Sequence, residues 1–194
     1  MNEQPLTPRP GRKRSQESRL AILTAAFELT SELGYAGLTV EGIAIRAGTG
    51  KQTIYRWWPS KADVLLDALA TKADLYVPVS DDHGSYAADL HAFLVASFAL
   101  GRNETVVATL RALMAQAQFD QAFGQRLRSE FLQRRRDALA VITDRAAARG
   151  DLPADPPPAI VADIVFGVIW YRLLTTDEPI EDQLADRLVA TLAQ

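Results

Sequence analysis

The sequence contains no cysteine among its 194 residues and only two histidines. Without cysteine the chain can form no disulfide, no iron–sulfur cluster and no thiolate zinc site, and it has no thiol nucleophile. Uninterrupted apolar runs are too short to cross a bilayer, and the N-terminus lacks the apolar segment of a secretory signal. We therefore expect a cytoplasmic protein without a membrane span, a metal site or a cofactor.

Charge divides unevenly along the chain. Residues 1–61 carry nine Lys or Arg and five Asp or Glu, whereas residues 62–194 carry twelve and nineteen. The resulting net charges of +4 and −7 fit a protein that touches a polyanion with its first part only. At 48% apolar and 23% charged residues, the composition is that of a globular chain with a buried core.

Apolar residues recur at helical spacing, and no run alternates as a strand does, so we expect an all-α fold of about nine helices. Ser15 and Thr39 are the expected N-caps of the first and second helices, and Gly124 marks a candidate break in a long helical stretch. The predicted helices cover 15–33, 40–47, 51–58, 61–76, 86–100, 104–117, 119–149, 159–176 and 180–193.

Three regions follow from this pattern. Residues 1–14 are rich in proline and basic side chains, and we expect a disordered arm there. Residues 15–61 are expected to form a small three-helix head, and residues 62–194 a larger helical body. The arm offers three basic side chains that could contact DNA: Arg12, Lys13 and Arg14.

Two short helices around Gly48-Thr49-Gly50 have the spacing of a helix-turn-helix. The second helix of this motif lies in the major groove, with its first residues at the base edges. Those residues are Lys51, Gln52 and Thr53, and lysine can donate to guanine while glutamine can bind adenine in bidentate fashion. Side chains that could reach phosphates follow one to three turns later: Tyr55, Arg56, Trp57 and Lys61.

The distinctive run of this region is residues 53–61, Thr-Ile-Tyr-Arg-Trp-Trp-Pro-Ser-Lys. Shorter matches precede it at Gly34-Tyr35, Leu38-Thr39-Val40, Ile43-Ala44 and Ala47-Gly48. Together they resemble the head of the tetracycline-repressor (TetR) family of bacterial transcription regulators over residues 15–66. The body matches more loosely, in its length and helical layout. The resemblance implies a homodimeric repressor in which residues 15–61 bind DNA, while the helical body, residues 62–194, holds a small-molecule pocket and dimerises.

Residue by residue, the resemblance makes Lys51 and Gln52 the base-reading pair. Glu41 falls where some members contact a base, although a glutamate there also suits the positive end of a helix. The chain departs from the family at two positions. Thr49 stands where the family usually has a small apolar residue, and Gly50 stands where it usually has a Ser or Thr cap. Glycine is still a tolerated N-cap. The phosphate-contacting positions of the family correspond to Thr39, Thr53, Tyr55, Trp57 and Lys61.

Two sets of residues in the body are candidates for function. Residues 159–176 are apolar nearly all round, so the helix they form must be buried on both sides. With the last helix it would form a four-helix dimer seam, unless it lies deep within one chain; the seam residues would be Ile164, Val168, Leu184 and Leu188. The candidate ligand pocket comprises Phe93, Phe98, Met114, Phe131 and Trp170, which are equally the residues of an ordinary core.

Other patterns favour ordinary structure. Gly48-Thr49-Gly50-Lys51 resembles the end of a phosphate-binding loop, but Ile45 and Gln52 occupy positions where that motif needs glycine and Ser or Thr. The run Arg134-Arg135-Arg136 is expected on a solvated face, with Glu130 pairing with Arg134. The two histidines, His83 and His91, lie near aspartates but are expected to be solvated rather than metal ligands.

The sequence therefore predicts a ligand-responsive DNA-binding regulator rather than an enzyme. It would repress transcription by binding a near-palindromic operator as a homodimer, and a small, mainly apolar molecule would release it. The alternatives are an all-α small-molecule-binding or interaction module without specific DNA binding, and a helical nucleotide-dependent enzyme that uses the Gly-Lys turn.

Overall fold

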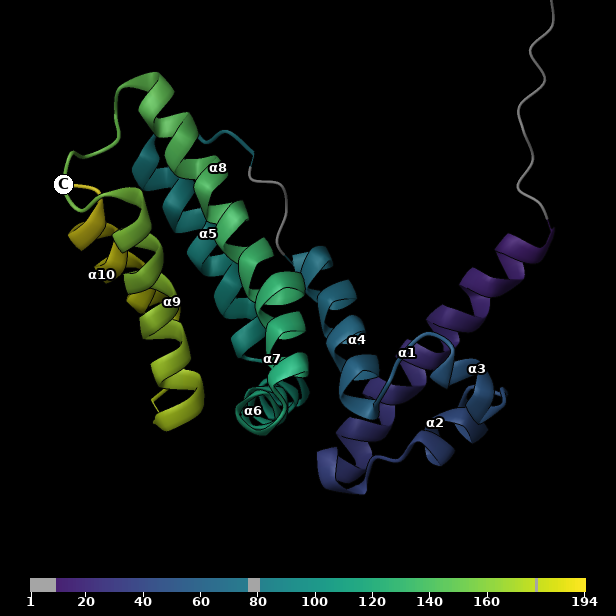
Figure 1. Ribbon diagram of the computed structural model, residues 1–194. Helices are drawn as coiled ribbons and strands as arrows, with labels where there is room; N and C mark the ends of the chain where they lie inside the picture. The colour runs from purple at the N-terminus through teal and green to yellow at the C-terminus, as the bar shows by residue number, and fades with distance from the viewer. Residues whose placement is uncertain (1–9, 77–80, 177) are drawn as a thin grey trace, which may run out of the picture. The chain divides into compact units, whose positions relative to one another are not determined.

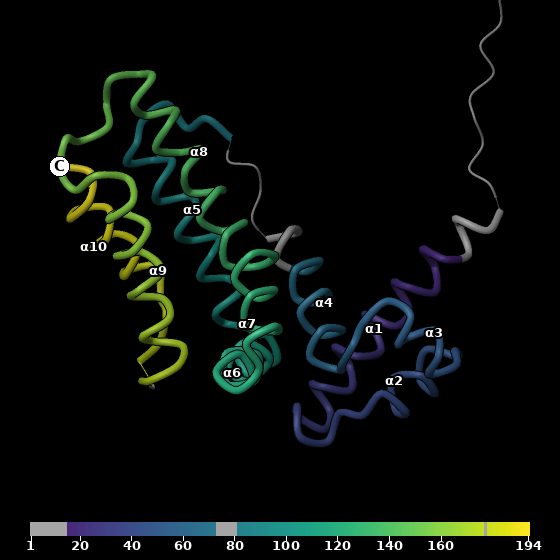
Figure 2. Tube along the Cα trace, viewed as in Figure 1, coloured from purple at the N-terminus to yellow at the C-terminus, as the bar shows by residue number. Residues whose placement is uncertain are grey.

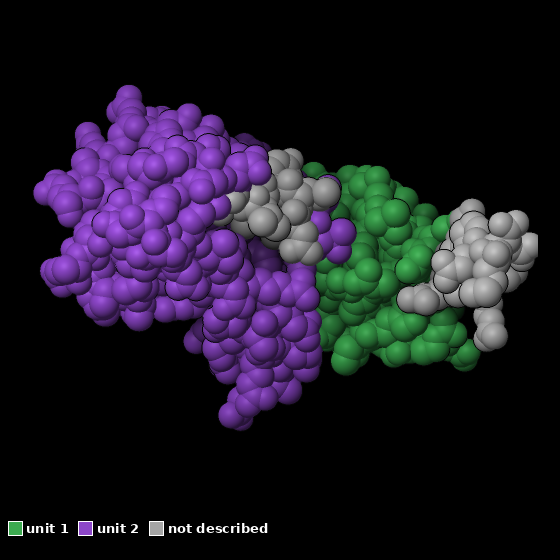
Figure 3. Space-filling model, turned by 90° about the horizontal axis from the view of Figure 1, so that it is seen from above, with its two compact units in different colours: residues 1–68 green, residues 69–194 purple. Residues whose placement is uncertain are grey.

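The computed structural model describes residues 10–76, 81–176 and 178–194 (Figure 1). Throughout these ranges the regular structure is helical, which confirms the all-α prediction. The chain divides into two compact units, Met1–Ala68 and Leu69–Gln194 (Figure 3). The division falls within one helix, later in the chain than the boundary expected after Lys61.

The first unit contains three helices and the start of a fourth: α1 (Pro10–Gly37), α2 (Val40–Arg46), α3 (Lys51–Tyr55) and α4 (Lys61–Tyr76). The expectation that the first helix begins at Ser15 is wrong, because α1 already begins at Pro10. Proline can begin a helix because the N–H that it lacks would have no hydrogen-bond partner in the first turn. The side chains of the predicted DNA-contacting arm (Arg12, Lys13 and Arg14) lie outside the described residues, as does all of 1–9.

Apolar side chains from all four helices form the core of this unit. Gly34, with φ 68°, interrupts the helical geometry near the end of α1, and the chain then turns toward α2. The fully or almost fully buried side chains of this core include Ile22, Leu38, Ile43, Ile54 and Leu65. Ile43 of α2 and Ile54 of α3 are fully buried, and α2 contacts both α1 and α3, so these two side chains fix the short helices in the core.

The second unit contains six further α-helices and a π-helical segment. Their bounds are α5 (Tyr86–Gly101), α6 (Glu104–Phe119), α7 (Gln121–Leu127), η1 (Arg128–Leu132), α8 (Gln133–Arg149), α9 (Pro158–Thr175) and α10 (Asp182–Leu192). Helix α5 lies beside α8 and α10, while α9 contacts α6 and α8 (Figures 1 and 2). This unit is therefore built around α5 and α8.

The long helical stretch predicted over 119–149 breaks at Asp120, not near Gly124. Asp120 leaves helical geometry and its carboxylate accepts from the N–H of Phe123 at 2.9 Å, so it caps α7. Gly124 lies inside α7, where a Cβ atom would stand 2.9 Å from the carbonyl oxygen of Ala117. The glycine thus permits the close approach of α6 and α7 and does not break the helix.

Helix α9 is, within the described ranges, the one helix long and apolar enough to cross a membrane by length and composition. Asp163 and Arg172 interrupt this helix, so its uninterrupted apolar run is still shorter than a bilayer requires. Val161, Val165 and Ile169 are buried within the unit, so one face of α9 belongs to its core. The opposite face leaves Ile160 and Tyr171 exposed.

Candidate nucleic-acid interface

The turn between α2 and α3 is closed by backbone hydrogen bonds. Gly48 adopts φ 62°, in the left-handed region, and the N–H of Thr49 donates to the carbonyl of Ala44 at 2.9 Å. Gly50 is the N-cap of α3 and has an ordinary extended conformation with φ −87°. The tight turn therefore requires a glycine at position 48. At position 50 glycine is not required, and it leaves α3 without a side-chain cap.

Helix α3 presents its first residues to solvent. Lys51 and Gln52 are exposed and Thr53 is half-buried, while Ile54 is completely buried and anchors the helix. The helix ends at Tyr55, earlier than the predicted end at Trp58, and the chain continues in turns. The two predicted base-reading side chains thus project from the head as the sequence predicted, and their contact with DNA stays a prediction.

Lys51 makes an ion pair with Glu41. Its Nζ lies 2.6 Å from Oε1 of Glu41, in the first turn of α2, and both side chains are exposed. The hydrogen bond and the opposite charge lower the pKa of Glu41 and raise that of Lys51. Glu41 therefore does more than favour the positive end of α2, because it also positions the Lys51 ammonium.

Thr39 combines an exposed side chain with a fixed orientation. It is the N-cap of α2, and its Oγ1 accepts from the N–H of Gly42 at 3.0 Å. A hydroxyl that accepts this bond keeps its own O–H as a donor. The predicted N-cap is confirmed, and the free donor is available to a phosphate oxygen.

Two neighbouring tryptophans support the basic side chain beside them. The guanidinium carbon of Arg56 lies 5.2 Å from the ring centroid of Trp57, and that ring stands edge-on to Trp58 at 5.3 Å. Trp58 is buried and its Nε1 donates to Asp67 at 3.0 Å. The sequence-based list of functional residues omitted Trp58, which supports Trp57 and thereby Arg56 without facing solvent itself.

Lys61 bonds to main-chain atoms near the end of α1. Its Nζ donates to the carbonyl oxygens of Tyr35 and Leu38, each at 2.9 Å, and lies 4.4 Å from the Tyr35 ring centroid. The ammonium thus has an internal role that the resemblance did not predict. Phosphate contact by Lys61 stays a prediction, as it does for Tyr55, which is 54% exposed.

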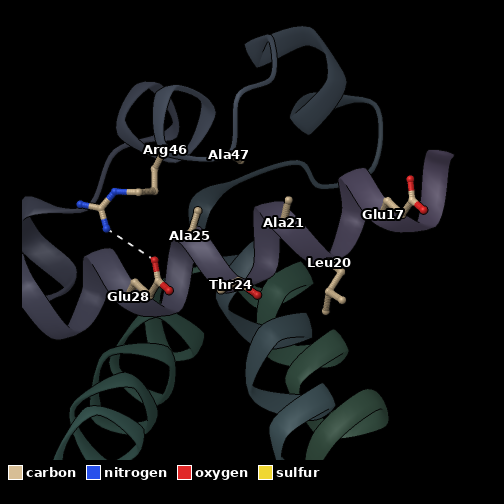
Figure 4. A pocket seen from close by; sticks show the side chains of 8 residues that line it. All are labelled: Glu17, Leu20, Ala21, Thr24, Ala25, Glu28, Arg46 and Ala47. Carbon is tan, nitrogen blue, oxygen red and sulfur yellow. Dashed lines mark ion pairs between the residues drawn. The ribbon is translucent and has the colours of Figure 1, made fainter.

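An open hollow of about 460 Å³ lies between α1 and the end of α2 (Figure 4). On one side of it, Arg46 forms ion pairs with Glu28 at 3.5 Å and with Glu32 at 2.8 Å. Glu17 adds a further carboxylate to the lining. Because its acidic groups would repel phosphates, this hollow is not part of the predicted DNA-binding surface; its arginine holds α2 against α1.

The predicted pocket residues lie in or near the core of the body. Phe93, Phe98 and Phe131 are buried, and Met114 and Trp170 are half-buried. Phe93 packs edge-on against Phe166 of α9, with ring centroids 6.3 Å apart. Their role as a ligand pocket stays a prediction.

The expected solvated face at residues 134–136 is only partly present. Arg134 is exposed, and Arg136 is paired with Asp163 at 2.8 Å, but Arg135 is buried, with 7% of its surface exposed. The expectation was wrong for Arg135 because it lies on the face of α8 that packs toward α5.

Three of the four predicted seam residues remain accessible. Ile164, Val168 and Leu184 are half-buried, whereas Leu188 is 8% exposed and belongs to the chain's own core. Helix α10 turns this residue inward because α10 packs against α5. A seam therefore cannot use Leu188 as the sequence suggested.

The sequence matches two models of known families. "Bacterial regulatory proteins, tetR family" matches residues 22–68, and "Tetracyclin repressor-like, C-terminal domain" matches residues 80–192. The HTH-type transcriptional regulator YdeS of Bacillus subtilis, itself uncharacterised, is 34% identical over 181 residues, covering 92% of this chain and 89% of that protein.

Solved structures agree with these matches. The TetR family transcription regulator SCO0332 superposes with a TM-score of 0.77 at 31% identity, covering 90% of this chain and 96% of that one. The transcriptional regulator FadR of Bacillus subtilis, solved in complex with stearoyl-CoA, superposes with a TM-score of 0.71 over 90% of this chain and 97% of that one. At 19% identity, this second likeness shows the fold alone. Both parts of the chain match the family, and the protein is thus a member of the TetR family of bacterial transcriptional regulators.

Proposed function

We propose that this regulator represses transcription by placing α3 of each of two subunits in successive major grooves of a near-palindromic operator. The observation that carries the proposal is the exposure of Lys51 and Gln52 at the start of α3, while Ile54 anchors the same helix from behind. Thr39, Tyr55 and Arg56 would contact the flanking phosphates, which position the head without reading sequence.

A second copy of the chain would complete the binding unit. The exposed face of α9 carries Ile160, Tyr171 and Leu174, and α10 adds the half-buried Leu184. An apolar face of this kind favours a protein interface, and two helices from each subunit would form a four-helix seam. Twofold symmetry in the protein would then be matched by symmetry in the operator.

A small, mainly apolar molecule would relieve repression by binding in the helical body. The buried phenylalanines Phe93, Phe98 and Phe131 support this placement, since ligand sites between helices are lined mainly by apolar and aromatic groups. Release requires the molecule to bind the DNA-free and DNA-bound states with different affinity. A coupling of about 1–3 kcal/mol would change operator affinity about 5- to 150-fold.

The test is footprinting and gel-shift analysis with the DNA that flanks the protein's own gene. The wild type should protect a near-palindromic site, and Lys51→Ala and Gln52→Ala should each weaken binding to that site by about 1–3 kcal/mol. Arg128→Ala, which removes an exposed positive charge from η1 in the body, is the matched control and should bind normally. Binding that ignores sequence, or that both head variants leave intact, would favour a small-molecule-binding module over a repressor.

A further inference from the structure

Arg135 occupies a core position of α8. The other residues on the same helical face are apolar and buried: Phe131, Leu139, Ile142 and Ala146. Arginine is rarely buried unless a counterion accompanies it, because removing a charge from water is costly. The burial of a charged side chain at this core position therefore needs an explanation.

The protein itself only partly satisfies the Arg135 guanidinium. Nη2 donates to Oγ of Ser97 at 3.0 Å, and Nη1 is buried with no hydrogen-bond partner among the described residues. No carboxylate in the described part of the chain forms an ion pair with it. Burial lowers the pKa of Arg135 to about 10, which still leaves the group protonated at neutral pH. A buried positive charge thus lacks a negative partner.

The surroundings of this charge are apolar. Ser97 lies on the buried face of α5, which also carries Leu90, Phe93 and Leu94. Phe131 precedes Arg135 by one turn, at the π-helical segment η1, and such segments occur frequently at functional sites. One charged group and one hydroxyl among aromatic side chains are the usual composition of a site for an amphiphilic ligand.

We propose that the effector is an apolar molecule bearing one carboxylate, which pairs with Arg135 between α5 and α8. The free Nη1 donates to one carboxylate oxygen, and Ser97, which accepts from Arg135, keeps its O–H to donate to the ligand. The apolar part of the ligand lies among Phe93, Phe98 and Phe131. This inference rests on the proposed function for the existence of an effector, and it adds the chemical class of that effector.

Calorimetric titration of the full-length protein tests the proposal with decanoate, decanol and decyl phosphate. The wild type should bind decanoate about 10- to 100-fold more tightly than decanol, the range expected for one charge-assisted hydrogen-bonded pair. Arg135→Met should abolish this preference and leave the binding of decanol unchanged. Arg128→Met, the same change at an exposed position, should keep the wild-type preference.

Two further variants keep the test informative if Arg135→Met folds poorly. Arg135→Lys preserves the charge and should keep part of the preference for decanoate over decanol. Ser97→Ala should weaken the binding of decanoate several-fold and leave the binding of decanol unaffected. Equal affinity of the wild type for decanoate and decanol, or an undiminished preference in Arg135→Met, would overturn the proposal. Tighter binding of decyl phosphate than of decanoate would overturn the choice of a carboxylate.

These titrations contain no DNA, so they separate the two proposals. A preference for decanoate that depends on Arg135, without release of the operator, leaves the carboxylate site standing and contradicts the proposed switch. Release of the operator by decanol and decanoate alike gives the opposite result: the switch stands and the carboxylate site does not.

Discussion

Glu41 holds the Lys51 ammonium 2.6 Å from its carboxylate, and thereby joins the first turn of α2 to the first residue of α3. The side chain that is to read a base is thus already engaged in the free protein. Bound DNA must therefore either displace Glu41 from the Lys51 ammonium or bind with the Glu41 carboxylate close to it. A carboxylate close to the backbone phosphates opposes binding to any sequence that offers no compensating contact.

Glu41→Gln should therefore raise the affinity for non-specific DNA by about two- to fivefold and lower the ratio of specific to non-specific affinity, because an exposed pair contributes only modestly. The salt dependence of binding should steepen by about one unit, since Lys51 can then neutralise a phosphate. Gel shifts on operator and random duplexes over a salt series measure both quantities. Glu130→Gln in the body is the control, and an unchanged specificity ratio in Glu41→Gln would contradict this role.

The stability of the body should depend on the ionisation of Asp89. This carboxylate is fully buried and accepts from the N–H of His83 at 2.8 Å and from Arg149 at 2.9 Å, with Arg145 at 3.2 Å. Burial raises the pKa of Asp89, but these hydrogen bonds and charges outweigh it, so the pKa lies below its usual value.

A carboxylate with a depressed pKa contributes stability above the unfolded pKa of about 3.9 and loses it as the pH falls through the folded value. Asp89→Asn should destabilise the protein by about 1–3 kcal/mol near neutral pH, since Arg145 and Arg149 lose their bonds to the buried carboxylate while Arg149 keeps Asp82 and Asp151. Urea unfolding at about pH 7 and about pH 3 should show that the difference between wild type and variant shrinks in acid. A difference that stays constant over this range would show that Asp89 acts by packing alone.

Val168→Asp should convert a dimer into a monomer, because it places a charge on the accessible face of α9. Light scattering after size exclusion measures the mass, and operator binding should weaken together with dimerisation. Val141→Asp, which changes an exposed valine of α8 outside the proposed seam, should leave the mass unchanged. If Val168→Asp keeps the wild-type mass, the seam lies elsewhere.

Gly124→Ala should destabilise the body by about 1–3 kcal/mol, the usual cost of overpacking, although alanine favours a helix over glycine. The reason is the 2.9 Å approach of the new Cβ atom to the carbonyl of Ala117. Ala122→Gly, at an exposed position of α7, should cost about 0.5–1 kcal/mol from helix propensity alone. Chemical denaturation compares the two, and a stabilised Gly124→Ala would show that α6 and α7 can separate without cost.

The sequence predicted much of the head because its signals are local. Thr39 as N-cap, Gly48 in the turn and the start of α3 at Lys51 each depend on neighbours within a few residues, and the structure has them all. The pairing of Lys51 with Glu41 depends on how α2 packs beside α3. Spacing along the chain does not determine that packing, so the Lys51–Glu41 pair could not be predicted from the sequence.

The body shows the same limit. Helix spacing correctly indicated that Phe93, Phe98 and Phe131 are buried. The run of three arginines predicted a surface position for Arg135, because consecutive arginines usually face solvent. Leu188 was predicted to lie in the dimer seam, because the sequence does not show that α10 packs against α5. Both errors concern which face of a helix meets a neighbour.

The π-helical segment η1 accounts for a row of buried side chains with a period of four in this part of the body. Every fourth side chain from Phe123 to Leu139 is buried, by way of Leu127, Phe131 and Arg135. In a regular helix of about 3.6 residues per turn, each such step drifts by about 40°, and four steps would carry the row about 160° around the axis. The wider turn of η1 unwinds the helix and reduces this drift, so a row with a period of four can stay on one side. The π-helical segment thus keeps Phe123 and Leu127 on the side of the helix where Arg135, Leu139 and Ile142 lie in α8 at ordinary helical spacing.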